Sequence, residues 1–235
     1  MLEPRVGVIS PDQLVAQIVL EHPRCARLLV ERDIDFCCRG AVPLSEACAG
    51  AGLEVTTLLA ELQAVASLEP ASSSGVDPRS LTSLQLVAHI VDQHHVYLRK
   101  ALPLLELLAA RVVEAHAARQ PSLERMQSVL HALRGLLEPH LHKEEAVLFP
   151  LLIGGRAQQR IREELGWMRS EHLQVGEALR ELRLLSERFV PPAWACPTYR
   201  ALMSELETMD RDTLEHVHLE NNVLAPRFGA SPGNE

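Results

Sequence analysis

The feature that most constrains the fold is a near-repeat of eleven residues in the second half of the chain. HLHKEEAVLFP begins at His140 and HVHLENNVLAP begins at His216, and six of the eleven positions are identical. Both copies place a glutamate four residues after the first histidine. Residues four apart on an α-helix differ by about 40° in azimuth, so each histidine and its glutamate face one direction. The repeat therefore predicts two helices that each present an imidazole and a carboxylate on one face.

Each copy is preceded by another histidine at nearly the same distance. His95 lies 45 residues before His140, and His172 lies 44 residues before His216. Counted from the turns expected between the helices, the members of each pair lie at similar distances, and antiparallel helices rise equally, by about 1.5 Å per residue. We therefore expect four helices to bring six side chains to one layer of the core: His95, His140, Glu144, His172, His216 and Glu220.

A buried layer with this many polar groups costs free energy unless the groups have partners, and two metal ions bridged by two carboxylates would satisfy them. Nitrogen and oxygen ligands without thiolate suit iron, manganese or zinc, and a carboxylate-bridged pair in a helical bundle favours iron. A single His-x-x-x-Glu is more often a solvated helix face or a weak ion pair. The two matching copies favour metal, although spacing alone leaves His94 and His89 as alternatives to His95.

The other histidines do not fit this layer. His142 and His218 also repeat, but at about 200° from the first histidine of each copy, so we expect them on other helix faces or as donors behind the ligands. His22, His116 and His131 match no spacing and are expected to be incidental.

The second half of the chain has helical periodicity and is rich in Leu, Ala, Glu and Arg. Gln120-Pro121, Gly154-Gly155 and Pro191-Pro192 interrupt the pattern, which predicts four long helices over about 81–117, 122–152, 157–190 and 198–224. Short connections make neighbouring helices antiparallel. We therefore expect an all-α fold whose main part, residues 81–235, is an up-down-up-down four-helix bundle.

Residues 69–80 contain two prolines, a glycine and a run of serines, which predicts a linker. Before it, residues 1–68 are expected to form a small helical domain around DFCCRG, which contains the neighbouring Cys37 and Cys38. The five cysteines do not indicate a disulfide framework in a chain with no expected export signal. Adjacent cysteines are either unremarkable half-buried thiols or a reactive pair, and the residues alone leave both open.

Charge and composition exclude two classes of partner. The chain has 23 Lys and Arg against 31 Asp and Glu, a formal charge of -8, and 3% aromatic residues, which argues against nucleic-acid binding. The longest apolar stretch, Ala101 to Val113, contains a proline and two charged residues and falls short of the roughly 20 residues that a membrane span needs. We therefore expect a cytoplasmic protein without membrane contact.

Three motifs in this order, IDFCCRG, HxxKEExxLFP and HxxLENNVLxP, resemble those of the bacterial repair-of-iron-centres proteins, which are di-iron proteins of iron-sulfur cluster repair. The resemblance covers nearly the whole chain. It implies a hemerythrin-like bundle that binds two iron ions per chain, bridged by Glu144, Glu220 and an oxo group. The family's ligand lies eight residues before a helix proline, here Pro103, which favours His95 as the first ligand.

The resemblance also implies a function. The protein is expected to help restore iron-sulfur clusters damaged by nitric oxide or peroxide, by donating iron or by reducing nitric oxide at the two irons. Its partners would be damaged iron-sulfur proteins, nitric oxide or oxygen, and an unknown electron donor, with a homodimer as a further option. The alternatives are a non-catalytic hemerythrin-like sensor or binder of nitric oxide or oxygen, and a scaffold without metal chemistry.

The resemblance assigns roles to three residues outside the ligand set. Cys37 and Cys38 match the family's double cysteine and would handle iron, nitric oxide or redox equivalents. Arg39 is expected to lower a thiol pKa, and Gly40 to give the backbone freedom to expose both sulfurs. Glu171, directly before His172, matches an acidic position that would shape access to the irons.

Overall fold

The computed structural model describes residues 8–68, 77–155 and 157–229, and the regular elements within these ranges are helices. The all-α prediction is therefore confirmed. The chain divides into two compact units, one formed by residues 1–81 and 218–235 and the other by residues 82–217. Most of the expected linker, residues 69–76, lies outside the described residues, and its last three residues form the short helix η1 (Pro78–Ser80).

The first unit contains four short helices: α1 (Val15–Glu21), α2 (Cys25–Glu31), α3 (Leu44–Ala51) and α4 (Val55–Ser67). Pro23 lies between α1 and α2 and divides the apolar segment 13–30 into two helices, because proline lacks the N–H that a continuous helix needs. Ile18, Leu29, Leu44 and Leu62 are completely buried and form the core of this unit. The unit also includes η5 (Ala225–Phe228), where the Arg227 guanidinium donates to the carbonyl of Leu81 at 2.7 Å.

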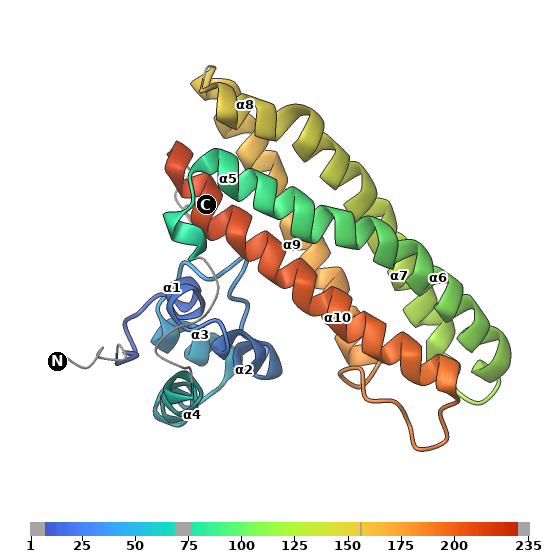
Figure 1. The fold of residues 1–235 in the computed structure, drawn as a ribbon. Coiled ribbons are helices and arrows are strands. Elements are labelled where there is room, and N and C mark those ends of the chain that lie inside the picture. The colour runs from blue at the N-terminus through green and yellow to red at the C-terminus, as the bar shows by residue number, and fades with distance from the viewer. Residues whose placement is uncertain (1–7, 69–76, 156, 230–235) are drawn as a thin grey trace. The chain divides into compact units, whose positions relative to one another are not determined.

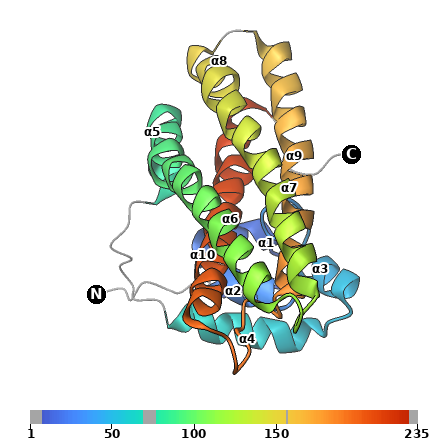
Figure 2. The ribbon, with the colours of Figure 1, turned by 90° about the vertical axis from the view of Figure 1, so that its right-hand side faces the viewer.

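The second unit is the helical bundle. Four helical runs lie side by side in both ribbon views (Figures 1 and 2), and α7 packs against α6 and α9. The first run consists of α5 (Ser83–His89), η2 (Ile90–His95) and α6 (Val96–His116), and the second of α7 (Ser122–Lys143), η3 (Glu144–Leu148) and α8 (Phe149–Gly154). The third is α9 (Gln158–Leu185) and the fourth is α10 (Pro197–Leu219). The chain passes into the first unit at residue 218, so η4 (Glu220–Leu224), which continues α10, is counted there.

Three of the four runs contain or continue into a π-helical segment, in which the turn is wider than in an α-helix. These segments are η2, η3 and η4, and they include His95, Glu144 and Glu220 respectively. Single π-helical turns inside α-helices occur frequently at functional sites. The predicted ligands therefore coincide with the places where the helices depart from regular geometry.

The third long helix is shorter than predicted, because α9 ends at Leu185 rather than near Val190. The Ser186 hydroxyl donates to the Leu182 carbonyl at 2.7 Å and accepts the Phe189 N–H at 3.1 Å. Such side-chain bonds to the backbone compete with helix continuation. Residues 187–189 then adopt positive φ angles of 50° to 62°, which turn the chain out of the helix.

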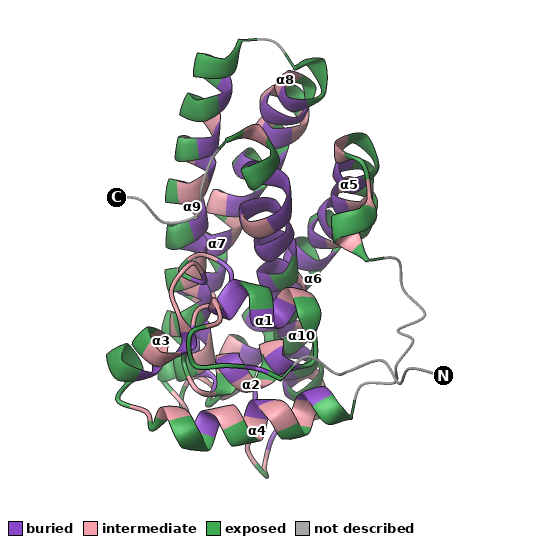
Figure 3. Cartoon of the chain, turned by 90° about the vertical axis from the view of Figure 1, so that its left-hand side faces the viewer, coloured by how far each residue is buried: buried purple, intermediate pink, exposed green. Residues whose placement is uncertain are grey.

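The bundle helices bury one face and expose the other. In Figure 3 the side of α9 that points toward the other bundle helices is largely buried, while its outer side is largely exposed. Apolar side chains such as Leu102, Leu133 and Leu179 are completely buried. Among the described residues, no helix combines the length and the apolar character that crossing a membrane would require.

Candidate metal centre

Each of the four long runs places one predicted histidine in the buried interior. His95 ends η2, His140 lies in the last turn of α7, His172 lies in α9 and His216 lies near the end of α10. Their exposed fractions are 0% or 1%. Glu144, the first residue of η3, is also completely buried.

The four imidazoles form two similar pairs. His95 Nε2 lies 3.1 Å from His216 Nε2, and His172 Nε2 lies 3.0 Å from His140 Nε2. The ring centroids are 4.8 Å apart in both pairs, with interplanar angles of 65° and 66°. The repeat in the sequence therefore appears in space as two halves of nearly equal geometry.

Glu144 lies between the two pairs and turns one oxygen toward each. Its Oε2 is 3.4 Å from His95 Nε2 and 4.0 Å from His216 Nε2. Its Oε1 is 3.2 Å from His140 Nε2 and 3.9 Å from His172 Nε2. A carboxylate in this position can bind one cation with each oxygen, which is the arrangement of a bridging ligand.

Glu220 is the first residue of η4, one helical turn after His216, and is completely buried. It belongs to both groups of side chains whose ligand atoms all lie within 4.8 Å of one another: His95, Glu144, His216 and Glu220, and His140, Glu144, His172 and Glu220. Each group thus combines two imidazoles with the same two carboxylates.

The donor set fits two metal cations. Two carboxylates without exposure to solvent are costly to bury unless cations neutralise them. His95 and His140 each direct Nδ1 to a carboxylate outside the cluster, so in its neutral form each presents a lone pair on Nε2 to the interior. Nitrogen and oxygen donors without thiolate suit iron, manganese or zinc.

Glu145, which was not among the candidate residues predicted from the sequence, orients the first histidine. Glu145 Oε1 accepts from His95 Nδ1 at 2.7 Å and from Arg99 Nη1 at 2.8 Å. Burial alone would raise the pKa of Glu145, but the hydrogen bonds from Arg99 and His95 outweigh it and lower the pKa. Histidine ligands commonly donate their second nitrogen to such a carboxylate, which fixes the ring. The signal in the sequence was the second glutamate of the KEE motif.

Glu171 performs the equivalent task in the other half. Its Oε2 accepts from His140 Nδ1 at 2.7 Å, and its side chain is 23% exposed. The residue was expected to shape access to the metal site. The structure places it directly behind a predicted ligand, at the edge of the bundle.

The structure distinguishes the two neighbouring candidates for the first ligand. His95 lies in the cluster, whereas His94 directs Nδ1 to Asp212 Oδ1 at 3.0 Å and stacks on the His216 ring at a centroid distance of 5.6 Å. His94 therefore packs behind a predicted ligand rather than beside the carboxylates.

The second histidine of each copy of the repeat differs in burial. His142 is exposed, as expected, but His218 is 3% exposed within the first unit, where it contacts the Phe36 ring and Asn222. Burial lowers the pKa of His218 to about 4, although a hydrogen bond with the Phe36 backbone opposes this shift. His218 is thus a buried residue of the first unit and does not belong to either group of candidate ligands.

The double cysteine is held in a tight loop. Asp35 Oδ1 accepts the N–H groups of Cys37 and Cys38 at 3.0 and 2.8 Å, and the two sulfurs are 3.4 Å apart. The Cys37 carbonyl accepts from the side-chain amides of Asn221 and Asn222 at 3.1 and 3.0 Å. The sequence pattern gave no indication of these two amide contacts.

The surroundings of Cys37 differ from what the sequence suggested. The hydrogen bond with Cys38, followed by burial and the charge of Asp35, raises the pKa of Cys37 well above its usual value, so Arg39 does not lower the pKa of this thiol. Gly40 also does not serve to expose both sulfurs, since Cys37 is 3% exposed. A side chain at Gly40 would place its Cβ 2.2 Å from the Phe36 carbonyl oxygen, so the glycine permits close backbone packing.

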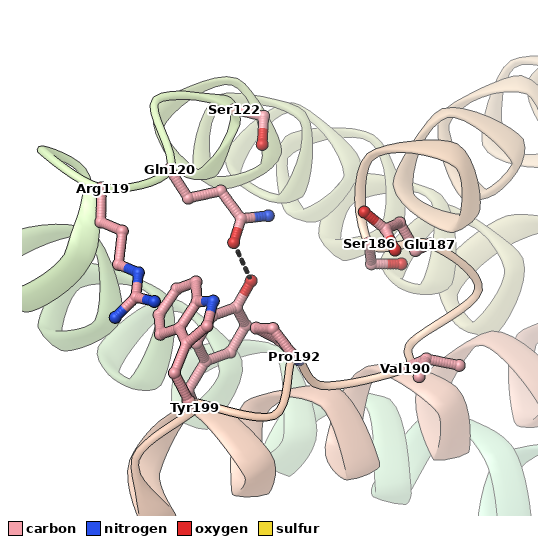
Figure 4. A pocket seen from close by; sticks show the side chains of 9 residues that line it. Arg119, Gln120, Ser122, Ser186, Glu187, Val190, Pro192 and Tyr199 are labelled. Atoms are coloured by element: carbon pink, nitrogen blue, oxygen red, sulfur yellow. Dashed lines mark hydrogen bonds between the residues drawn. The ribbon is translucent and has the colours of Figure 1, made fainter.

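A polar cavity of about 420 Å³ lies at the end of the bundle where α6, α7 and α9 meet their connecting turns. Figure 4 shows Tyr199 directed toward Gln120, with a hydrogen bond of 3.2 Å, and Arg119 beside the aromatic rings. Nearby, His116 Nε2 lies 3.2 Å from Cys196 Sγ and lowers the pKa of that thiol. None of the cavity's lining residues belongs to the predicted ligand layer.

The comparisons with known proteins agree with this geometry. The family described as the hemerythrin HHE cation binding domain matches residues 86–228, and ScdA_N, described as a domain of unknown function (DUF542), matches residues 11–66. The chain is 34% identical over 216 residues to the iron-sulfur cluster repair protein YtfE of Edwardsiella ictaluri (strain 93-146), covering 92% of this chain and 96% of that protein. It is 33% identical, with the same coverage, to the YtfE proteins of Yersinia pestis (strain Pestoides F) and Yersinia pseudotuberculosis serotype O:1b (strain IP 31758).

These matches define a hemerythrin-like cation-binding domain in one chain with a second module that matches another family. The chain belongs to the family of hemerythrin-like iron-sulfur cluster repair proteins.

Proposed function

We propose that this protein binds two iron ions per chain and acts in the repair of iron-sulfur clusters damaged by nitrosative or oxidative stress, in the cytoplasm, with damaged iron-sulfur proteins as its clients. The observation that carries the proposal is the position of Glu144, which directs one oxygen toward each histidine pair. The names of the relatives support the repair role, and the buried donor set supports a pair of metal ions.

The proposed ligands are His95, His140, His172 and His216, with Glu144 and Glu220 as shared carboxylates. A bound iron pair would supply open coordination positions and the ability to change oxidation state. The residues of the chain hold the ligand atoms in position. Glu145 and Glu171 orient the imidazoles of His95 and His140, and complete burial of the ligand layer restricts the access of water.

We propose two ways in which this site could serve repair: release of iron to a damaged protein, or reduction of nitric oxide with electrons from a partner. The neighbouring thiols of Cys37 and Cys38 are proposed to assist, since they lie in the module that matches residues 11–66. A non-catalytic sensor of nitric oxide or oxygen is the competing function. If Cys37→Ser with Cys38→Ser leaves recovery of damaged clusters in cells intact, the thiol-assisted mechanism is wrong.

The direct test of the metal assignment is elemental analysis of protein purified without oxygen or chelator. We expect about two irons per chain. The His216→Ala variant should lose iron, whereas the His131→Ala variant is a matched control because His131 is an exposed histidine paired with Glu106. Zinc in place of iron, or an iron content that His216→Ala does not change, would contradict the proposal.

A further inference from the structure

The two halves of the ligand layer share a plan but differ behind the ligands. In each half, one imidazole directs Nδ1 to a carboxylate at 2.7 Å, His95 to Glu145 and His140 to Glu171. The two carboxylate side chains are similarly accessible, with exposed fractions of 30% and 23%. Solvent exposure therefore does not distinguish the Glu145 carboxylate from the Glu171 carboxylate.

The difference is a cation on one side only. Arg99 Nη1 donates to Glu145 Oε1 at 2.8 Å, and this is the same oxygen that accepts from His95. Among the described residues, Glu171 forms its hydrogen bond and ion pair with His140 alone. The Glu145 oxygen that accepts from His95 therefore also accepts from a guanidinium, whereas the Glu171 carboxylate accepts from His140 alone.

This difference changes the donor strength of the two imidazoles. An ionised carboxylate that accepts a hydrogen bond from the Nδ1–H group polarises the ring and makes the opposite nitrogen a stronger ligand. A guanidinium on the same oxygen neutralises that charge and competes for its lone pairs. The Nε2 atom of His95 is therefore a weaker donor than the Nε2 atom of His140.

Lys143 and Asp212 also lie near the layer, but they do not reverse this order of donor strength. Lys143 Nζ lies over the Trp167 ring, which is near His140, but it is paired with Glu164 Oε2 at 2.9 Å. Asp212 bonds to His94, which stacks on His216 and is not in the ligand groups. Within the described part of the chain, Glu171 contacts His140 and pairs with no lysine or arginine.

We infer that Arg99 is a positioning residue that acts through Glu145 to make the His95–His216 position the weaker of the two metal positions, so that iron bound there leaves first. The inference rests on the proposed two-iron centre and adds the direction of release. It assigns the exchangeable ion to one half of the layer and the retained ion to the half that contains His140 and His172.

The test follows the loss of iron from the full chain loaded with two ferrous ions. Transfer to an excess of chromogenic chelator is measured under anaerobic conditions, and the wild-type protein should release iron in two phases of similar amplitude. Arg99→Gln should slow the fast phase by about tenfold and leave the slow phase unchanged, as expected for a change behind a metal ligand. Glu171→Gln should accelerate the slow phase by a similar factor.

Arg125→Gln is the matched control, because Arg125 also pairs with a glutamate, Glu181, at 2.7 Å on the bundle surface. It should leave both phases unchanged. Mössbauer spectra provide a readout that loss of packing would not produce: two distinct iron environments in the wild-type protein should become more alike in Arg99→Gln.

A protein that holds two irons but releases them in one phase would overturn the inference and leave the proposed metal centre intact. The same holds if Arg99→Gln leaves the fast phase unchanged or has the same effect as Arg125→Gln. A wild-type protein that binds no iron would overturn the proposed function itself, and the two failures are therefore distinguishable.

Discussion

The ligand layer and the cysteine loop both place a carboxylate next to a candidate reactive group, with opposite chemical results. In the layer, Glu145 and Glu171 accept hydrogen bonds from Nδ1 of His95 and His140 and leave the opposite ring nitrogens available to bind a cation. In the loop, the Asp35 carboxylate lies 3.2 Å from Cys37 Sγ and helps to raise the pKa of that thiol.

A neighbouring carboxylate thus prepares a neutral imidazole to bind a cation but disfavours the thiolate form of a cysteine. The loop keeps Cys37 protonated, because its hydrogen bond with Cys38, burial and Asp35 all disfavour the thiolate. A change in the surroundings of Cys37 would be needed for it to act as a nucleophile or a metal ligand.

The largest expected effect is the response of the bundle's stability to iron. A ligand that binds only the folded state at a free concentration of 1,000 times its Kd adds about 4 kcal/mol to the free energy of unfolding. For a unit of this size that corresponds to a rise in Tm on the order of 10 °C. Differential scanning calorimetry with and without ferrous iron measures it. The His216→Ala variant should not show this rise in Tm. A wild-type Tm that does not change when iron is added would contradict iron binding by the ligand layer.

The second prediction concerns Glu144, which faces both histidine pairs. Glu144→Gln keeps the shape but removes the charge, so both metal positions should weaken, by more than the 10–100-fold typical of groups behind a ligand. Equilibrium dialysis against ferrous iron gives the affinities. Glu163→Gln is the control, since Glu163 is exposed on α9 and bonds only to Gln159 among the described residues. Loss of a single ion would show that Glu144 does not bridge.

The layer follows from the sequence because its information is local and periodic. A histidine and a glutamate four residues apart on a helix must share a face, and equal spacing from a turn sets the height of His95 and His172. The structure brings all six predicted residues together. The assignment of iron to them stays a prediction.

What the sequence did not predict depends on contacts between distant residues. The Cys37 carbonyl is held by Asn221 and Asn222, more than 180 positions away, and Arg99 reaches Glu145 across two helices. The end of α9 was also misplaced, because the Ser186 hydroxyl replaces a backbone partner at a position where the apolar pattern continues. The periodicity of apolar residues predicts which face of a helix is buried, but it does not predict which distant side chain packs against that face.

The third prediction tests whether the cysteine loop depends on close packing as the layer depends on ligands. Gly40→Ala would place a methyl group 2.2 Å from the Phe36 carbonyl oxygen and 2.8 Å from the Ala16 Cβ. We expect the first unit to lose about 1–3 kcal/mol of stability, the usual cost of overpacking. Gly50→Ala is the control, because its Cβ would meet nothing within 4 Å. Urea unfolding measures both, and equal midpoints would refute the packing role of Gly40.

The smallest expected effect concerns the thiols and tests the suppression of Cys37 directly. Because the pKa of Cys37 is raised, its thiolate fraction at pH 7 is small and its alkylation by iodoacetamide should be slow, accelerating as the pH rises. Cys38→Ser removes the thiol partner that contributes most to this shift. A fall of one unit in the pKa would increase the thiolate fraction, and with it the labelling rate of Cys37 at pH 7, by up to about tenfold.

Cys196 supplies the internal reference for this experiment. His116 lowers the pKa of Cys196, so peptide mass mapping should find it labelled before Cys37 in the wild-type protein. His116→Gln should slow its labelling and leave that of Cys37 unchanged. If Cys37 instead reacts as fast as Cys196 at pH 7, the loop does not disfavour the Cys37 thiolate. The proposed difference between the cysteine loop and the ligand layer would then be wrong.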